Sequence, residues 1–214
     1  MYIPKYYRIE DHEAIRSFIT GSPFGIFVAH DGTKPIATHM PLLLREVEGR
    51  EVLDGHVARS NPLWQVAPTN DEVLAIFQGP HTYISSSWYR DANVPTWNYV
   101  AIHVYGPCKV LDFPAFGEAM QYLLNHFEGA RPNGRTWDRL PEEFLERQMR
   151  AIVGLRIDIT RIEAAQKMSQ NRTDEDFFNI VKALEASAAH EDQAVARVMR
   201  RVRPDLFEPG SHIF

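Results

Sequence analysis

The first 110 residues of the chain are organised as short apolar runs separated by turn residues, a pattern typical of β-structure. From residue 24 onward these runs are typical of extended chain. Turn chemistry such as Asp31-Gly32 indicates hairpins. The predicted strands are 24–30, 36–44, 52–57, 73–78, 81–85 and 96–111.

Two features of these runs lead to further expectations. Gly79-Pro80 is expected to separate the run over 73–78 from the run over 81–85. Residues 96–111 are apolar on both alternating faces. We therefore expect this strand to be covered on both sides, by the core and by a helix or a partner chain.

Helical spacing of apolar residues is confined to fewer segments, most of them in the second half of the chain. The predicted helices are 10–19, 61–67, 113–127, 141–150 and a tail that is helical from Thr173. The apolar face of that tail is formed by Phe177, Ile180, Val181 and Leu184.

Hairpin signals outweigh repeating strand–helix units along the chain. One more strand is predicted over 151–162, where apolar and polar residues alternate. The predicted fold class is therefore mainly β with peripheral helices (α+β), an antiparallel barrel or sandwich rather than a doubly wound sheet.

The composition is that of an ordinary globular protein. The chain has 214 residues, of which 44% are apolar and 24% charged, which suits one domain with at most a small appendage. No apolar run approaches the roughly 20 residues that span a bilayer, and the first 15 residues lack the apolar segment of a signal peptide. Cys108 is the only cysteine, which excludes an internal disulfide framework and multi-cysteine zinc sites. We expect a cytoplasmic protein with no membrane partner.

A polar junction between a predicted strand and a predicted helix carries the strongest candidate chemistry. In His56-Val57-Ala58-Arg59-Ser60-Asn61-Pro62, a strand ends, a guanidinium and two small polar side chains follow, and a helix begins. The first turn of a helix has N–H groups without partners, and Arg59 adds a fork suited to phosphate. These groups predict that the junction binds a phosphate monoester. A helix capped by Asn61 beside a solvated arginine explains the same residues.

Two further segments are candidates for polar contacts. Lys167-Met168-Ser169-Gln170-Asn171-Arg172 follows the last predicted strand, and five of its six residues can hydrogen-bond. A polar connector is the alternative interpretation. In Ala37-Thr38-His39-Met40-Pro41, the proline interrupts a strand and marks an edge or a bulge. Backbone groups that the proline leaves without a strand partner can hydrogen-bond to the polar edge of a heterocycle. A β-bulge with no ligand explains the proline equally well.

Other patterns exclude several classes of protein. The histidines are scattered without HxxxH or HExxH spacing, so no metal site is predicted. The phosphate loops GxGxxG and GxxxxGK[ST] do not occur, which argues against Rossmann and P-loop nucleotide binding. The formal charge of −5 argues against a dominant nucleic-acid footprint. Four arginines form a local cluster that could contact DNA or form a solvated helix face: Arg197, Arg200, Arg201 and Arg203.

Several long segments together resemble the PaiB family, whose members are described as FMN-binding negative transcriptional regulators. The segments are MYIPKYYRIED at the start, GHVARSNPLW (55–64), IFQGPHTYISSSWY (76–89), VPTWNYVAIHVYG (94–106) and KMSQNR (167–172). The resemblance extends over residues 1 to about 185 in the same order. It implies a Greek-key split β-barrel of the FMN-binding type, usually a homodimer with the flavin at the subunit interface.

The resemblance also implies a set of cofactor-binding residues. They are Thr38, His39, Met40, His56, Arg59, Ser60, Asn61, Lys167, Ser169 and Gln170. Residues 59–61 would form the phosphate end of the FMN site, and Lys167, Ser169 and Gln170 its remaining polar shell. Residues 38–40 are candidates for the ring edge, and His56 for a nearby contact. Four aromatic residues would stack on the flavin or line the dimer core: Trp88, Tyr89, Trp97 and Tyr99.

These observations predict an FMN-binding domain over 1–170 and a C-terminal helical tail, 171–214, packed on the barrel. The predicted function is a homodimeric FMN-binding flavoprotein of the PaiB type that represses transcription. The alternative is a flavin-dependent oxidoreductase, similar to flavin reductases or pyridoxamine-phosphate oxidases, with no DNA role. No catalytic residue stands out, and an additional small-molecule ligand is compatible with both functions. Haem handling is a third possibility, but no histidine has a supporting context.

Overall fold

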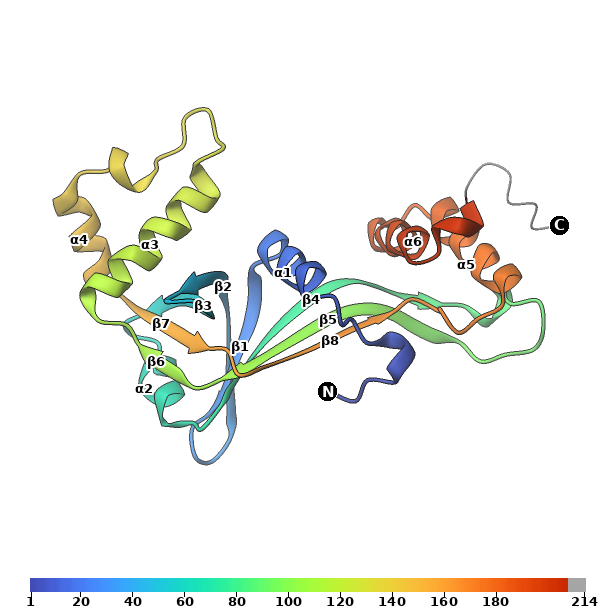
Figure 1. Ribbon diagram of the computed structural model, residues 1–214, viewed down its shortest axis with the longest axis horizontal. Helices are drawn as coiled ribbons and strands as arrows, with labels where there is room; N and C mark the ends of the chain where they lie inside the picture. Colours follow the sequence, from blue (N-terminus) through green and yellow to red (C-terminus); the bar gives the residue numbers. More distant parts are fainter. Residues whose placement is uncertain (208–214) are drawn as a thin grey trace. The chain divides into compact units, whose positions relative to one another are not determined.

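The computed structural model describes residues 1–207 of the chain; the end of the predicted tail, 208–214, lies outside the described residues (Figure 1). The strands are β1 Phe24–His30, β2 Pro35–Val47, β3 Arg50–Ala58, β4 Val73–Ile84, β5 Thr96–Gly106, β6 Cys108–Val110, β7 Ile152–Asp158 and β8 Arg161–Lys167. The helices are α1 His12–Gly21, α2 Leu63–Val66, α3 Phe113–Glu128, α4 Glu142–Arg150, α5 Asp174–Ala186 and α6 His190–Val202. Short 3₁₀ turns occupy 5–7, 67–69, 86–88, 137–139 and 204–207.

The strands form one sheet in the order β6-β7-β3-β2-β1-β4-β5-β8. Each pairing for which the register is known is antiparallel, including β1 with β2 and β3 with β7. The fold is therefore mainly antiparallel β with peripheral helices, as the sequence predicted. None of the helices in the described part of the chain is long and apolar enough to cross a membrane.

The chain divides into two compact units that are described separately. The first contains residues 1–15, 78–102 and the chain from 163 onward, and the second contains 16–77 and 103–162. Strands β4 and β5 contribute residues to both. The predicted boundary between 170 and 171 stays a prediction.

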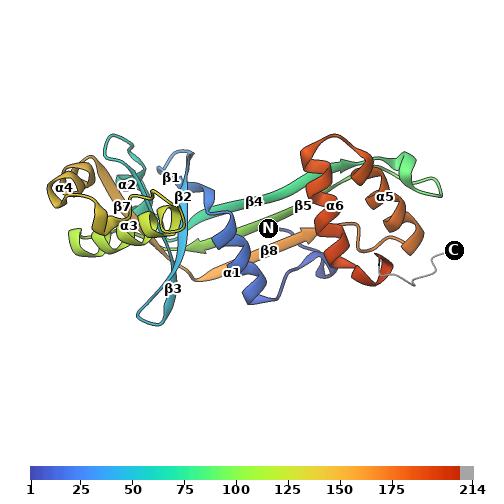
Figure 2. The same cartoon turned by 90° about the horizontal axis from the view of Figure 1, so that it is seen from above.

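In the first unit, α5 and α6 lie side by side (Figure 2). The four predicted apolar residues of the tail are all buried, and α6 adds Val195, Ala196, Val198 and Met199. Thr173 caps α5 by accepting a hydrogen bond from the Asp176 N–H at 3.2 Å. Strand residues fasten α6: Thr82 donates a hydrogen bond to Asp192, and Asn98 lies 3.5 Å from the Met199 sulfur.

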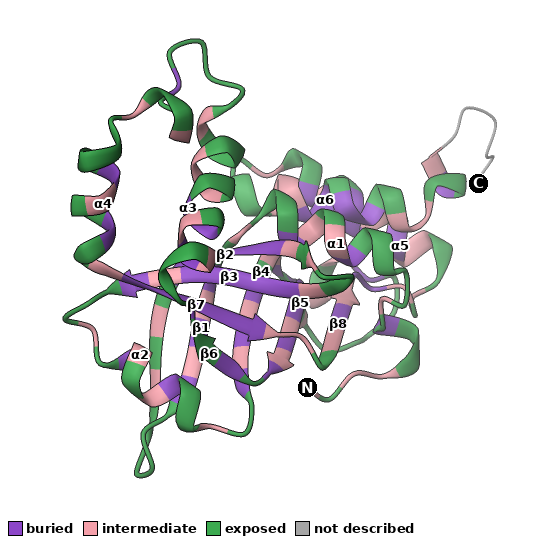
Figure 3. Ribbon diagram, turned by 60° about the vertical axis from the view of Figure 1, so that its left-hand side comes forward, coloured by how far each residue is buried: buried purple, intermediate pink, exposed green. Residues whose placement is uncertain are grey.

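In the second unit, α3 and α4 share an apolar cluster with the start of β7. Leu111, Phe116, Ala119, Met120 and Met149 form the buried part of this cluster. Gly154 on β7 makes room for the Phe116 ring, because a Cβ at that position would lie 2.3 Å from a ring carbon. Figure 3 shows buried positions running along β3 and β7 beneath these helices.

A buried ion pair joins β3 to β7. Asp54 and Arg156 are opposite one another in the register, and the two residues are 2% and 6% exposed. Arg156 donates two hydrogen bonds to the carboxylate, from Nε at 2.6 Å and from Nη2 at 2.8 Å. Arg45 on β2 donates a third at 2.8 Å. This arrangement satisfies the charge of Asp54 inside the sheet.

Four of the predicted strands, 73–78, 81–85, 96–111 and 151–162, differ from the structure. Strand β4 is continuous through Gly79-Pro80; its pairing with β1 covers only Leu74 to Ile76, so Pro80 lies outside that ladder and its missing N–H breaks no bond there. The run over 96–111 is two strands divided at Pro107, and one face of β5 is only half-buried.

The predicted strand over 151–162 was also wrong in extent. It ends at Asp158, and β8 begins separately at Arg161. Its polar positions Gly154 and Arg156 are buried together with the apolar ones, because β7 is covered on both faces. The ion pair with Asp54 explains how a charged residue occupies such a strand.

Candidate functional site

The junction at the end of β3 places Arg59 over the C-terminal end of α4. The guanidinium donates from Nε to the Arg150 carbonyl at 2.8 Å and from Nη2 to the Ile152 carbonyl at 3.2 Å. A cation at a helix C-terminus is stabilised by the helix dipole. Arg59 forms no ion pair with a carboxylate among residues 1–207. Its charge is uncompensated, and its side chain is exposed.

Two of the candidate segments meet directly at Thr38 and Asn61. The Asn61 Nδ2 donates to the Thr38 hydroxyl at 3.1 Å, and its Oδ1 accepts from the Leu63 N–H at 3.0 Å. Asn61 therefore caps the helix, as the alternative interpretation held. The helix α2 has four residues rather than the predicted seven, so its dipole adds little to anion binding.

The segment 38–40 divides between the two faces of β2. His39 is exposed and stacks on Phe24 with ring centroids 6.2 Å apart, whereas Met40 is 2% exposed and belongs to the core. Successive side chains of a strand point to opposite faces. Pro41 marks the position where β2 changes partner, from β1 over 35–41 to β3 over 42–47.

His56 faces an apolar cavity of about 230 Å³. The cavity is lined by His56, Met120, Leu123, Leu124, Trp137, Leu140, Phe144, Leu145, Gln148, Met149 and Ile152. The Nδ1 atom of His56 is buried and has no hydrogen-bond partner among the described residues. Burial lowers the pKa of this imidazole, which keeps the ring neutral at pH 7.

In the first unit, Lys167 ends β8 beside an aromatic and hydroxyl environment. Its Nζ donates to the Thr96 hydroxyl at 2.5 Å and lies 6.0 Å from the centre of the Tyr7 ring. Burial, and secondarily the charge of Arg172, lower the pKa of Lys167. No carboxylate pairs with this ammonium within residues 1–207, so it keeps an uncompensated charge as Arg59 does.

The residues that follow Lys167 are held by hydrogen bonds within the connector and to β5. Ser169 has a positive φ of 60° and donates its hydroxyl to Asn98 at 3.0 Å. Gln170 accepts from the Met168 N–H at 2.7 Å and donates to the Gln166 carbonyl at 2.5 Å. The Gln170 side chain therefore orders the connector itself, and the Ser169 side chain joins the connector to β5.

The aromatic candidates differ in exposure. Tyr89 is buried, with the Arg172 guanidinium 4.6 Å from its ring centre and a hydroxyl that has no partner in the described structure. Trp97 is 55% exposed and packs against His81 and Tyr83. An exposed aromatic cluster on adjacent strands is typical of an interaction surface.

The arginine cluster near the C-terminus is partly neutralised. Arg200 forms two hydrogen bonds with the Glu185 carboxylate, at 2.5 and 2.9 Å. Arg203 pairs with Asp174. Half of the cluster predicted as a DNA candidate therefore fastens α6 to α5.

Sequence reasoning missed the Asp54 ion pair and the cavities beside α3 and α4. A signal for the first was present, because Asp54 and Arg156 each interrupt an apolar strand run with a charge. The cavities depend on how two helices pack, for which the sequence contains no local signal.

Comparisons with known proteins agree with this architecture. Residues 1–161 match the family model FMN_bind_2, described as "Putative FMN-binding domain". The chain is 40% identical over 199 residues to "Protease synthase and sporulation protein PAI 2" of Bacillus subtilis, covering 93% of this chain and 96% of the relative.

Two solved structures are similar at 13% identity. The flavocytochrome Anf3 from Azotobacter vinelandii has a TM-score of 0.60, covering 80% of this chain and 73% of that one. The FAD and heme binding protein from Mycobacterium smegmatis has a TM-score of 0.58, covering 80% and 79%. The predicted antiparallel split barrel is confirmed as the fold.

Proposed function

We propose that this chain, which belongs to the family of FMN-binding domains matched over residues 1–161, uses Arg59 to hold the FMN phosphate. Its resemblance to the PaiB family predicted this membership. The observation that carries the proposal is the exposed Arg59 guanidinium without a carboxylate partner in the described structure. Two of its nitrogens are held by backbone carbonyls, which fixes the orientation of the group. The remaining N–H donors suit a phosphate dianion.

The other predicted ligands fit FMN to different degrees. Ser60 is exposed beside Arg59, and its hydroxyl has no hydrogen bond within residues 1–207. We propose Ser60 as a second phosphate contact, and the Lys167 ammonium of the first unit stays a predicted flavin ligand. Asn61, Ser169 and Gln170 are proposed to support these groups, since their side chains are already hydrogen-bonded.

The direction of each side chain on β2 limits which of residues 38–40 can contact the edge of the flavin ring. Thr38 is proposed as a side-chain contact, and Met40 is proposed to act through its backbone because its side chain lies in the core. His39 points to the opposite face of β2 from Thr38 and stays a prediction. When bound, FMN would supply one- and two-electron redox chemistry. The oxidoreductase alternative shares this premise and stays a prediction.

Replacing Arg59 with glutamine is expected to weaken FMN binding about tenfold or more, because a hydrogen bond to a charged group contributes about 1.5–3 kcal/mol. Riboflavin, which lacks the phosphate, should bind equally well to the variant and to the wild type. Fluorescence titration with both flavins measures this difference.

The matched control is Arg147→Gln, which removes an exposed cation of α4 that lies over Phe144. Circular dichroism of Arg59→Gln checks that α4 is intact, because Arg59 also binds the end of that helix. Equal loss of FMN and riboflavin affinity would contradict a phosphate contact.

We also propose that the protein is a homodimer with the flavin at the interface. The cluster of half-buried His81 with exposed Tyr83 and Trp97 supports a partner surface on β4 and β5. The half-buried second face of β5 agrees with this.

The Trp97→Gln variant is expected to raise the dimer dissociation constant about tenfold or more, since buried tryptophans are frequent interface hot spots. Light scattering across a dilution series measures the change. Tyr2→Gln, which removes an aromatic residue that is 89% exposed, serves as the control. A monomeric wild type, or a Trp97→Gln dimer of unchanged affinity, would contradict this surface.

A role in transcription is the second candidate function, and two exposed arginines of α6 favour it. Arg197 and Arg201 remain exposed. If they contact DNA, Arg197→Gln with Arg201→Gln should abolish the salt-dependent part of DNA binding. Fluorescence anisotropy at two salt concentrations checks this. Absence of salt-dependent binding by the wild type would remove this candidate.

A further inference from the structure

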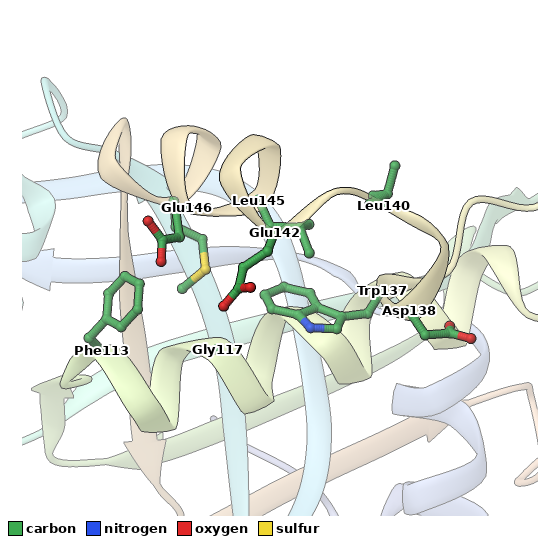
Figure 4. Close-up of a pocket in the computed structure, with 9 residues that line it drawn as sticks. Phe113, Gly117, Trp137, Asp138, Leu140, Glu142, Leu145 and Glu146 are labelled. Carbon is green, nitrogen blue, oxygen red and sulfur yellow. The ribbon is translucent and has the colours of Figure 1, made fainter.

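A cleft of about 290 Å³ lies between α3 and α4 in the second unit (Figure 4). It is lined by Phe113, Gly117, Trp137, Asp138, Leu140, Glu142, Leu145, Glu146 and Met149. None of these residues belongs to the flavin ligands proposed above. The cleft combines acidic and aromatic side chains in a way that indicates a particular class of ligand.

Two of the three acidic side chains come from one face of α4, and the third, Asp138, comes from the 3₁₀ turn over 137–139. Glu142 and Glu146 are four residues apart, so they are neighbours on the helix surface. Figure 4 shows both carboxylates directed into the space above α3. Glu146 lies 3.5 Å from Arg150, whose side chain is exposed, while Glu142 has no cationic partner among residues 1–207.

Aromatic rings flank these carboxylates. Figure 4 shows the Phe113 ring beside Glu146 and the Trp137 indole beside Glu142. The face of an aromatic ring attracts a cation, most strongly in tryptophan. Phe113 is 58% exposed although it is a large apolar residue at the start of α3, so its ring is available to a ligand.

We propose that this cleft binds a small organic ammonium ion. Two carboxylates repel an anion such as the FMN phosphate, and apolar walls do not suit a strongly hydrated inorganic cation. An alkylammonium group is complementary to both the acidic and the aromatic side chains, because its charge faces the carboxylates and its carbon atoms contact the rings.

Gly117 keeps the floor of the cleft open. A Cβ added at this position has no neighbour within 4 Å, although the residue lies within α3. A larger side chain there would occupy the cleft rather than displace the core. Glycine is also a poor helix former, so the substitution does not endanger α3.

Calorimetric titrations of the whole protein with choline and with 3,3-dimethyl-1-butanol, a neutral molecule of the same shape, test the proposal by comparing the two affinities. In about 150 mM KCl, where screening acts beyond roughly 8 Å, choline is expected to bind saturably and about tenfold more tightly than the alcohol. Glu142→Gln with Glu146→Gln should remove that preference.

Gly117→Leu is expected to abolish choline binding while the melting temperature and the FMN affinity stay at or above the wild-type values. The matched control is Gly21→Leu, at another glycine whose Cβ would have no neighbour within 4 Å. Equal binding of choline and the alcohol, unchanged binding by Gly117→Leu, or no choline binding by the wild type would overturn the proposal.

Discussion

Replacing Asp54 with alanine is expected to lower the free energy of unfolding by about 3–5 kcal/mol, because the change leaves a buried guanidinium without its counter-ion. Arg156 is 6% exposed and donates two hydrogen bonds to the Asp54 carboxylate. The hydrogen bond to that carboxylate is also the main cause that raises the pKa of Arg156. Urea denaturation of the two proteins measures the loss.

Asp158→Ala is the matched control on β7. This carboxylate pairs with Lys109 at 2.8 Å, but both side chains are about half exposed. An exposed pair contributes about 0–1 kcal/mol. A loss of less than about 1 kcal/mol for Asp54→Ala would show that the ion pair does not stabilise the sheet.

The Gly106→Ala substitution is expected to destabilise the protein by about 3 kcal/mol, at the upper end of overpacking effects. The added Cβ would lie 2.0 Å from the carbonyl oxygen of Asp158 and 2.8 Å from its carbonyl carbon. Hydrogen bonds on either side hold this backbone in place, from the Asp158 N–H to Pro107 at 3.0 Å and from the Thr160 N–H to Tyr105 at 2.9 Å. The chain therefore has no flexible group that could move away.

The same substitution at Gly117 provides the comparison. A Cβ there meets nothing within 4 Å, so Gly117→Ala should stabilise α3 by about 0.5–1 kcal/mol. Thermal unfolding of both variants checks the opposite signs. A Gly106→Ala protein as stable as the wild type would mean that the corner between β5 and β6 is looser than described.

Local periodicity predicted most of the elements of this fold. The helix over 113–127 and the apolar face of the tail are found as expected. These features depend on neighbours within a few residues. The fold class followed from them because hairpins are also local.

The errors arose where pairing between distant segments decides the structure. Pro80 interrupts no bond with β1 because the pairing of β4 with β1 ends at Ile76, and this is visible only in the register. The run over 96–111 divides at Pro107 because β6 pairs with β7, which lies about 45 residues further along the chain.

The same limit applies to the candidate site. The sequence selected Thr38 and Asn61 separately, and the fold joins them by a hydrogen bond. It could not show that Arg59 binds the end of α4, since α4 lies some 90 residues away. Met40 was selected with its neighbours, although strand parity turns its side chain into the core.

Titration of the purified full-length protein with FMN tests the central claim most directly. The change in the flavin absorbance spectrum that binding causes should saturate at one FMN per chain. Excess FMN at about 100 times the dissociation constant should raise the free energy of unfolding by about 2.7 kcal/mol. Binding that never saturates, together with an unchanged unfolding transition at high FMN, would contradict the claim that this chain holds the cofactor.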